Sequence, residues 1–317
     1  MRLSYRLGSL LLLALIAVFL LSRNIGSLSN DQPLQKPPKS DSRPRDIFTH
    51  LKTKLRLPQS RILGMNPSRE TTEIVVPNDR IIVMARLAAE DVGWVSGDLT
   101  DWRTMIYTVD DQNAPRHTPM NKGRESLAYL QFIVDHYHDL PSTIVFLHSH
   151  KDGYPGAWHT DNDASNNVES VRNLRMDVLH ERGYLNLRCQ HTPGCPVSIS
   201  PPRDDSRGRL SMDRVYKSAW KDLFNNTRIP ETISVPCCSQ FAVTKDQVLQ
   251  RPLSDYVWFY QWVLGNDLAD TMTSGVLENT WHIIFGQDPV YCPDEAQCYG
   301  DVYGISDGIS DGISDAA

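Results

Sequence analysis

Residues 144–163, IVFLHSHKDGYPGAWHTDND, bring together side chains that bind metal ions or transfer protons. His148 and His150 leave an apolar run as a His-x-His pair. Alternate residues of an extended chain point to the same side, so these two imidazoles could share one ion. Imidazole suits transition metals, and the pattern therefore predicts a divalent cofactor, Mn or Zn. The alternative is a hydrogen-bonded pair of loop histidines without a metal.

Two further candidates follow in the same loop. His159 and Asp161 lie within the next dozen residues, and Asp161 and Asp163 form an Asp-x-Asp pair that could hold the metal in place of the histidines. Asp161 is also a candidate catalytic carboxylate. Aspartate is common in loops because its side chain caps turns, so turn formation is the competing interpretation.

Glu278 and His282 form another group, in the sequence LENTWHIIF. Residues four apart share one face of a helix, so the two side chains should be neighbours. Burial beside Trp281 would raise the pKa of the Glu278 carboxyl towards the range in which a carboxylate works as a base. The alternative is an ordinary pair of side chains on a packed helix.

The elements that would position these residues are typical of an α/β fold. Apolar runs at 80–88, 104–109 and 142–147 predict buried strands. Apolar residues at helical spacing follow Asn121, which could cap a helix that Pro141 ends. Strand, strand, helix and strand with short connections predict a mainly parallel sheet flanked by helices. Further helices are predicted at 166–181, 211–224, 245–264 with an interruption at Pro252, and 274–285, and a late strand is predicted at 239–244.

The predicted sheet places the histidine pair where ligands usually bind. In open α/β sheets, ligands bind beyond the carboxyl ends of the strands. His148 and His150 leave the carboxyl end of a central strand, so we expect the binding site at that edge.

The amino-terminal residues predict a membrane anchor. A basic segment, 1–6, precedes an apolar run at 7–21. As a helix this run spans ~22 Å of a ~30 Å bilayer core, which suits a thin early-secretory membrane. More positive charge precedes the run than follows it, so the amino terminus should stay cytosolic and the rest should face the lumen, as in a single-pass type II protein. The alternative is a cleaved signal peptide and a secreted protein.

The rest of the chain divides into three parts. Residues 22–75 are polar and dotted with proline, as expected of a flexible stalk. Residues 76–303 should form a single globular luminal domain. Residues 304–317 repeat GISD and predict a low-complexity tail. The net charge of −6 and the pI of about 5.9 give no reason to expect a nucleic-acid partner.

The cysteines fit an oxidising compartment. Four of them form two short brackets, RCQHTPGC and YCPDEAQC, whose spacing predicts a local disulfide within each bracket rather than a zinc knuckle. The four are Cys189, Cys195, Cys292 and Cys298. Neighbouring cysteines rarely bond to each other, so one or both of Cys237 and Cys238 are expected to be free and buried. Asn225, in Asn-Asn-Thr, is the predicted glycosylation site.

Several stretches, spread in order through nearly all of the predicted domain, match a known family. They are RLAAEDVGWV, IYTVDD, NKGRESLAYL, TIVFLHSHKDGYPGAWHTD, GYLNLRCQHTPGCP, CCSQFAVTKDQVLQRP, ENTWHIIFG and CPDEAQCYGDVYG. The chain resembles the family of filamentous fungi catalogued as domain of unknown function 3431 (DUF3431), which carries no established activity. It departs from the family pattern at Val276, where members tend to have Arg, and at Gly300 and the GISD repeats, where they have more cysteines.

A second resemblance bears on mechanism. NKG (121–123) begins a predicted helix before the apolar run IVFL, and His148-Ser149-His150 stands where nucleotide-sugar glycosyltransferases of the GT-A type have a metal-binding Asp-x-Asp. CCSQFAVTKDQV is similar to the stretch that lines the acceptor side in such enzymes. The resemblance implies a GT-A-like fold and a metal held by His148, His150 and the late His282. It also implies that Glu278 is the base for the acceptor hydroxyl.

The same resemblance implies a donor site. Lys122 and Arg124, at a helix start, would bind the donor phosphates, because helix N-termini favour anions. Asp91 and Asp110, after the first two strands, would hold the nucleoside together with Arg86 of the first strand. A solvated helix turn and ordinary strand-end turns are the competing interpretations. The tryptophans that could stack on sugar faces, or pack in the core, are Trp94, Trp102 and Trp158.

Three functions follow as hypotheses. The first is a membrane-anchored, luminal Golgi enzyme of glycosyltransferase type, with a nucleotide sugar and a glycan acceptor as partners. The second is a metal-dependent hydrolase with His148, His150, His159 and Asp161 around an open zinc. The third is a non-catalytic carbohydrate-binding or accessory protein of the secretory pathway.

Overall fold

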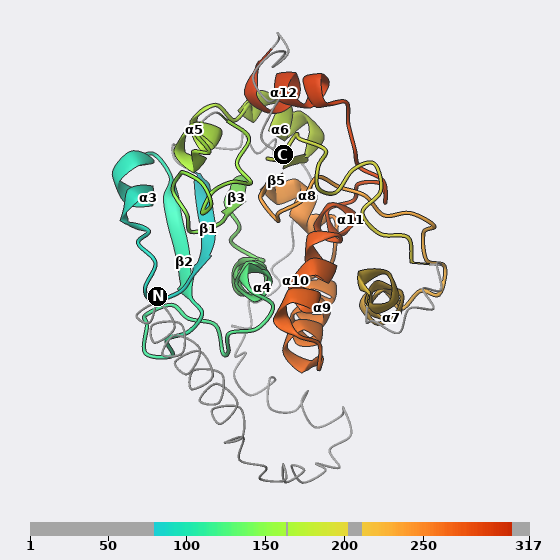
Figure 1. Ribbon diagram of the computed structural model, residues 1–317. Coiled ribbons are helices and arrows are strands. Elements are labelled where there is room, and N and C mark those ends of the chain that lie inside the picture. Colours follow the sequence, from blue (N-terminus) through green and yellow to red (C-terminus); the bar gives the residue numbers. More distant parts are fainter. Residues whose placement is uncertain (1–78, 163, 202–210, 306–317) are drawn as a thin grey trace, which may run out of the picture. The chain divides into compact units, whose positions relative to one another are not determined.

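The computed structural model describes residues 79–162, 164–201 and 211–305 (Figure 1). The predicted cytosolic segment, anchor and stalk and the GISD repeats from residue 306 onwards lie outside the described residues, so these predictions stay untested. Within the described ranges, no helix has both the length and the apolar character needed to span a bilayer.

A five-stranded mixed sheet forms the centre of the fold (Figure 1). The strands are β1 (Arg80–Arg86), β2 (Arg103–Thr108), β3 (Thr143–Leu147), β4 (Tyr184–Asn186) and β5 (Phe241–Thr244), in the order β2-β1-β3-β5-β4. β1 pairs in parallel with β2 and β3, whereas β5 is antiparallel to both β3 and β4. The α/β class is confirmed, but the prediction of a mainly parallel sheet is wrong at β5. The apolar run at 239–244 predicts a strand, but it contains no information about the direction of that strand in the sheet.

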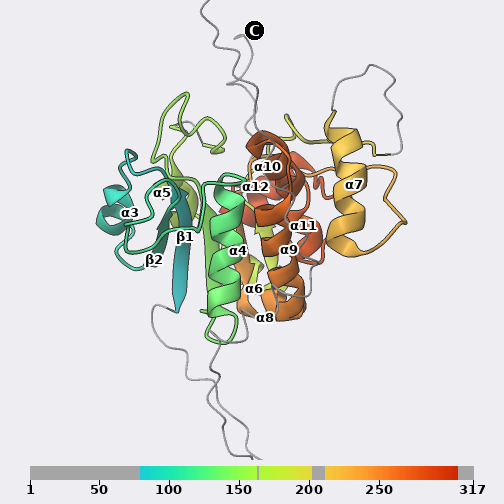
Figure 2. The ribbon, with the colours of Figure 1, turned by 90° about the horizontal axis from the view of Figure 1, so that it is seen from below.

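Helices cover both faces of the sheet. They are α3 (Gly93–Asp98), α4 (Glu125–His136), α5 (Asn167–Arg172), α6 (Met176–Arg182), α7 (Met212–Phe224), α8 (Lys245–Leu249), α9 (Leu253–Gly265), α10 (Asp270–Glu278), α11 (Trp281–Ile284) and α12 (Glu295–Tyr303). On one face α4 packs against β1 and α9, and Figure 2 shows α4, α9 and α7 side by side. The core of the other face contains residues of α3, α5, α6 and α12.

Side-chain alternation along the strands divides the apolar residues between these two cores. Ile81 and Val83 of β1 belong to the core with α4 and α9, while Ile82 and Met84 belong to the opposite core. This period of two is expected of a strand that is buried on both faces.

Local signals explain several helix ends, but not the start of α4, which matters for the site. Asn166 caps α5 by accepting from the N–H groups of Val168 and Glu169, and Gly183 ends α6 in the left-handed region. Pro252 separates α8 from α9, as predicted. The expected cap at Asn121 is wrong, because α4 begins only at Glu125 and has no side-chain cap.

The disulfides join the two cysteine brackets to each other. Cys189 is bonded to Cys298 and Cys195 to Cys292, so the predicted local pairing is wrong. The segment after β4 lies beside the start of α12, and sequence spacing contains no information about such long-range neighbours. Cys237 and Cys238 are bonded to each other and buried, which corrects the expectation that one or both are free.

Removing the first cross-bracket disulfide should cost much more stability than removing the adjacent pair. The Cys189–Cys298 bond encloses the Cys195–Cys292 bond. With that inner bond intact, it closes a loop of roughly 15 residues, for which loop entropy predicts a loss of about 3 kcal/mol in the Cys189→Ser, Cys298→Ser variant. The Cys237→Ser, Cys238→Ser variant is the control, because its ring excludes almost no unfolded conformations. Urea unfolding measures both variants, and equal losses would contradict this assignment.

Candidate functional site

The reversed strand β5 brings the start of one strand to the end of another. β3 ends at Leu147, and the backbone N–H of His148 donates to Gln240 Oε1 at 3.0 Å, one residue before β5 begins. Gln240 Nε2 donates to Asn167 Oδ1 at 3.3 Å, and Asn167 Nδ2 donates to the carbonyl of His150 at 2.8 Å. A buried amide network therefore holds the chain that leaves β3.

His148 and His159 form a close ring pair at this edge. Their ring centroids are 4.4 Å apart, and the Nε2 atom of each is buried without a hydrogen-bond partner among the described residues. Burial lowers the pKa of His148 to about 4, with further lowering from His150 and Arg124. Burial, followed by the charges of His148 and Arg188, lowers the pKa of His159 to about 3. Both rings are neutral at pH 7.

His150 has different surroundings. Its side chain is exposed, and its Nε2 lies 3.9 Å from Glu90 Oε1. Glu90 Oε2 accepts from the Ser149 hydroxyl at 2.8 Å and from the Leu87 N–H at 2.7 Å. The middle residue of His-Ser-His therefore ties the end of β3 to the loop after β1.

The third predicted metal ligand, His282, lies in the apolar core. It is fully buried, its Nε2 is 3.2 Å from the carbonyl oxygen of Pro289, and its ring stacks on Tyr291. No three His, Cys, Asp or Glu side chains in the described ranges are grouped so as to hold a metal ion. The predicted set His148, His150 and His282 does not fit one ion, because the buried His282 ring faces Pro289. The helical spacing of His282 from Glu278 does not show which way its ring turns.

Asp161 is enclosed by protein groups. Its Oδ2 accepts from the backbone N–H groups of Cys189 and Gln190 and from the Tyr299 hydroxyl, and its Oδ1 lies 3.2 Å from Arg188 Nη1. Burial raises the pKa of this carboxyl, although Arg188 and the N–H donors oppose the rise. These contacts support a structural role rather than the predicted catalytic one. Asp163 lies outside the described residues.

Two carboxylates meet where α4 begins and α10 ends. Glu125 opens α4, Glu278 closes α10, and both are half-buried. Burial and the charge of Glu125 raise the pKa of Glu278 to about 7, against the opposing effects of the Cys238 N–H and Arg124. Burial likewise raises the pKa of Glu125. Each negative charge opposes ionisation of the other carboxyl, which adds to the effect of burial on Glu278.

The backbone around this carboxylate pair adopts costly conformations. Arg124, Cys238 and Ser239 have φ values of 54°, 93° and 53°. L-residues avoid positive φ, and each such position costs about 1–3 kcal/mol. The Ser239 hydroxyl lies beside Glu125 without a hydrogen bond of normal geometry. The surrounding fold must enforce these conformations, as it does at many ligand sites.

Further polar atoms near the carboxylate pair lack partners. Ser126 Oγ, Tyr129 Oη and Trp281 Nε1 are buried without a hydrogen bond to any described residue. Ser126 follows Glu125 in the chain, and the pKa of Tyr129 is raised by burial and by the charge of Glu125. The Trp281 ring centroid lies 6.0 Å from that of Tyr129. Unpaired buried donors are costly, and a ligand with acceptor oxygens would pair them.

The predicted nucleoside-binding residues are engaged in local structure. Asp91 accepts from the Gly93 N–H at 2.8 Å, which is an ordinary turn contact. Asp110 accepts from the Ala88 N–H at 2.7 Å and so joins the ends of β1 and β2. The guanidinium of Arg86 donates to the Thr108 hydroxyl and to the carbonyl of Glu90. The contacts of Asp91 and Asp110 are therefore those of ordinary strand-end turns, which was the competing interpretation.

Of the two predicted phosphate ligands, only Arg124 is uncommitted. Lys122 donates to the carbonyl of Leu268 and lies 3.8 Å from Asp270, which also accepts from the Gly123 N–H. The Asp270 carboxylate therefore occupies the position near the start of α4 where a donor phosphate was predicted to bind. Arg124 is exposed and makes no hydrogen bond or ion pair with any described residue, yet its charge reaches Glu125, Glu278 and His148.

Trp158 is the tryptophan of the predicted three that is open to solvent. Trp94 and Trp102 are buried in the core, whereas Trp158 is 44 % exposed. The Arg188 guanidinium lies 5.2 Å from its ring centroid, and the His159 ring packs against it edge-on at 5.8 Å. The indole is thus held in one orientation beside the histidine pair.

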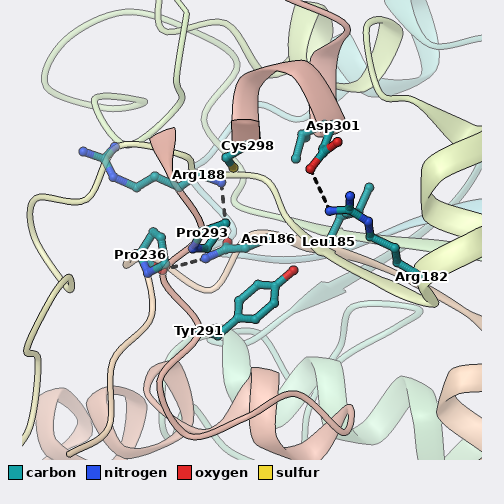
Figure 3. Close-up of a pocket in the computed structure, with 10 residues that line it drawn as sticks. Arg182, Leu185, Asn186, Arg188, Pro236, Tyr291, Pro293, Cys298 and Asp301 are labelled. Atoms are coloured by element: carbon teal, nitrogen blue, oxygen red, sulfur yellow. Dashed lines mark hydrogen bonds and ion pairs between the residues drawn. The ribbon is translucent and has the colours of Figure 1, made fainter. Parts of the chain in front are cut away.

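A cavity beside the Cys189–Cys298 disulfide is too small to be the site (Figure 3). Its volume of about 10 Å³ accommodates a single water molecule. Figure 3 shows Asn186, Tyr291 and the Arg182–Asp301 ion pair of 2.8 Å around it. This cavity is a packing feature of the region after β4.

Sequence reasoning did not select Glu125, Ser239 or Gln240 as site residues. Each lies in a stretch that it singled out, NKGRES or CCSQF, but nothing local shows that these stretches meet. The two stretches meet because β5 is antiparallel to β3 and therefore starts where β3 ends. The sequence does not contain the direction of β5.

Acidification should destabilise the protein through the histidine pair. The pKa of His159 is about 3 when folded, against an ordinary value of 6.5. Between these values the unfolded chain binds a proton that the folded chain does not, so stability falls as the pH drops from about 6.5 to 3. Each pKa unit contributes about 1.4 kcal/mol. Urea unfolding from pH 7 to 4 should show a shallower decline for His159→Gln than for wild type, and parallel curves would contradict the assignment.

A family model described as "Protein of unknown function (DUF3431)" matches residues 82–301, and the chain belongs to this family. No curated protein and no solved structure matches the chain. The likeness to GT-A enzymes therefore stays a prediction.

Proposed function

We propose that this DUF3431 protein is a glycosyltransferase-like enzyme that moves a sugar from a nucleotide donor to a hydroxyl of a glycan acceptor. The observation that carries the proposal is the pair Glu125 and Glu278, in which one carboxyl has its pKa raised to about 7. The pair lies near the chain that leaves the carboxyl end of β3, at the edge where α/β sheets bind ligands.

Glu278 is the general base in this proposal. An acceptor hydroxyl must lose its proton as it attacks the sugar, and a base works best when its pKa is close to the working pH. An ordinary glutamate is too weak a base, whereas Glu278 has a pKa of about 7 and is half-buried. Glu125 acts as a positioning residue that keeps this pKa high through its negative charge.

Arg124 is the proposed donor ligand. Its guanidinium is uncommitted among the described residues and lies near enough to influence both carboxylates and His148. Guanidinium groups bind phosphate oxygens through paired N–H donors. A divalent metal, Mn or Zn, stays part of the proposal only as an ion carried by the donor phosphates, because the predicted three-histidine set does not fit one ion.

Trp158 is the proposed platform for the acceptor. The Arg188 guanidinium and the His159 ring fix its indole, and almost half of its surface remains exposed. Sugar rings have an apolar face that stacks on such a surface, while their hydroxyls reach polar partners. The indole lies beside His159, whose ring contacts that of His148.

A luminal, type II membrane-anchored protein of the Golgi or secretory pathway is the proposed setting. The two cross-bracket disulfides support it, because such bonds persist in oxidising compartments. The anchor itself and the alternative of a secreted protein rest on the amino-terminal sequence.

A metal-dependent hydrolase is the second candidate. The unpartnered Nε2 atoms of His148 and His159 support it, because both rings are neutral and close together. Asp161, the proposed carboxylate ligand of that site, is instead paired with Arg188. The third hypothesis, a non-catalytic carbohydrate-binding or accessory protein, would retain the Trp158 platform without needing a base at Glu278.

Nucleotide binding should depend on Arg124. UDP or GDP, with and without Mn, should raise the thermal stability of the ectodomain, because a ligand at 100 times its Kd adds about 2.7 kcal/mol. Arg124→Gly should abolish that shift without lowering the melting temperature of the ligand-free protein, since glycine accepts the positive φ at this position. Lys217→Ala, on the exposed side of α7, is the charge-matched control and should behave as wild type.

A shift that survives in Arg124→Gly would remove Arg124 from the donor site. If Zn alone raises the melting temperature of the wild type and no nucleotide does, the result would support the hydrolase in place of the transferase.

Glu278→Gln should lower the rate of sugar transfer about 100-fold or more, because the amide cannot accept the proton. Nucleotide binding should be unchanged. Glu181→Gln, at an exposed position of α6, is the control. Turnover of the nucleotide sugar with a hydroxyl acceptor measures the effect, and a rate within a few-fold of wild type would exclude Glu278 as the base.

The partner variant separates the base from its neighbour. Glu125 raises the pKa of Glu278, so Glu125→Gln should shift the acidic limb of the pH–rate profile to lower pH while leaving a measurable rate. An unchanged profile would contradict the coupling of the two carboxylates.

A further inference from the structure

A groove lies between the end of α7 and the start of α9. Figure 2 shows these two helices on the same side of the sheet as α4. It has a volume of about 600 Å³ and is lined by the last turn of α7, the chain just after it and the start of α9. The Phe224 and Phe259 rings pack together at 5.8 Å, and the Arg251 guanidinium lies within 6 Å of both ring centroids. The groove thus combines an aromatic region with a cationic side chain.

Trp258 presents an oriented aromatic surface to this groove. Its indole Nε1 donates to the carbonyl of Asp222 at 2.7 Å, which fixes the ring against the last turn of α7. Even so, 49 % of the side chain is exposed. A ring held by its indole N–H offers its apolar face to a ligand that has both apolar and polar surfaces.

Asn225 lines the same groove and begins the only Asn-x-Thr sequon that the sequence allows. It ends α7 in the left-handed region with φ 47°, and its side chain is exposed and makes no hydrogen bond within the described part of the chain. The sequon residues Asn226 and Thr227 are exposed as well.

We infer that an N-linked glycan on Asn225 occupies this groove, with its first N-acetylglucosamine against the indole of Trp258. The apolar face of the sugar would cover the ring, and its hydroxyl and acetamide groups would reach Asp255 and Lys221, which also line the groove. The inference needs luminal exposure, which the disulfides support, but it does not depend on the proposed sugar transfer.

The attachment is an ordinary transfer from a lipid-linked oligosaccharide diphosphate by the host's own machinery. The amide nitrogen of Asn225 forms a bond to the anomeric carbon and loses one proton, while the bond from that carbon to the phosphate breaks and the lipid diphosphate leaves. The fold then determines whether the glycan stays in solvent or rests on the protein.

The test compares glycan release from folded protein expressed through a eukaryotic secretory route. Intact mass should show one N-glycan on wild type and none on Thr227→Ala, which keeps Asn225 itself. A peptide N-glycosidase should release the glycan from native Trp258→Ala at least 10-fold faster than from native wild type, because the covering ring is gone. Trp158→Ala, which removes an exposed tryptophan outside the groove, should match wild type.

A second measurement does not depend on whether the glycosidase can reach the glycan. Acrylamide quenching of tryptophan fluorescence should be stronger in Thr227→Ala than in glycosylated wild type, and that difference should vanish when Trp258→Ala is added to both. A secreted wild type without glycan, or equal release rates and equal quenching, would overturn the inference.

Discussion

The direction of one short strand determines where the site can be. β5 runs against β3 and β4, so its first residues meet the last residues of β3. This places Ser239 and Gln240 beside His148, and it brings the adjacent disulfide at Cys237 and Cys238 to the carboxylates of α4 and α10. A parallel β5 would put the same residues at the opposite edge of the sheet. The arrangement of the acid–base pair therefore follows from a backbone pairing, not from the local sequence of either helix.

Desolvation is the physical effect that gives this edge its chemistry. Burial lowers the pKa values of His148 and His159 and raises that of Glu278, so that both rings are neutral and the Glu278 carboxyl is only partly ionised at physiological pH. Asp161 is also buried, but Arg188 and two backbone N–H groups stabilise its charge. The two buried carboxyls, Asp161 and Glu278, thus differ in role because Asp161 has compensating partners and Glu278 has a like charge beside it.

The sequence predicted what depends on short-range periodicity and missed what depends on long-range contacts. β1, β2 and β3 lie within one residue or two of the predicted runs, and the Pro252 break is where it was expected. The spacing of Glu278 from His282 and the resemblance to GT-A enzymes point to Glu278, but its partner Glu125 lies more than 150 positions earlier in the chain. The metal set failed because the spacing of His282 does not reveal that its ring turns towards Pro289. The disulfide pairing failed for the same reason, since two brackets of similar spacing can close internally or with each other.

The crossed disulfides also impose an order of events during biosynthesis. Chain synthesis produces Cys189 and Cys195 roughly a hundred residues before their partners, given separations of 109 and 97. In that interval the two early thiols are close enough in sequence to join each other, and such a bond would have to be exchanged later. The final covalent framework can therefore close only when nearly the whole domain has been synthesised.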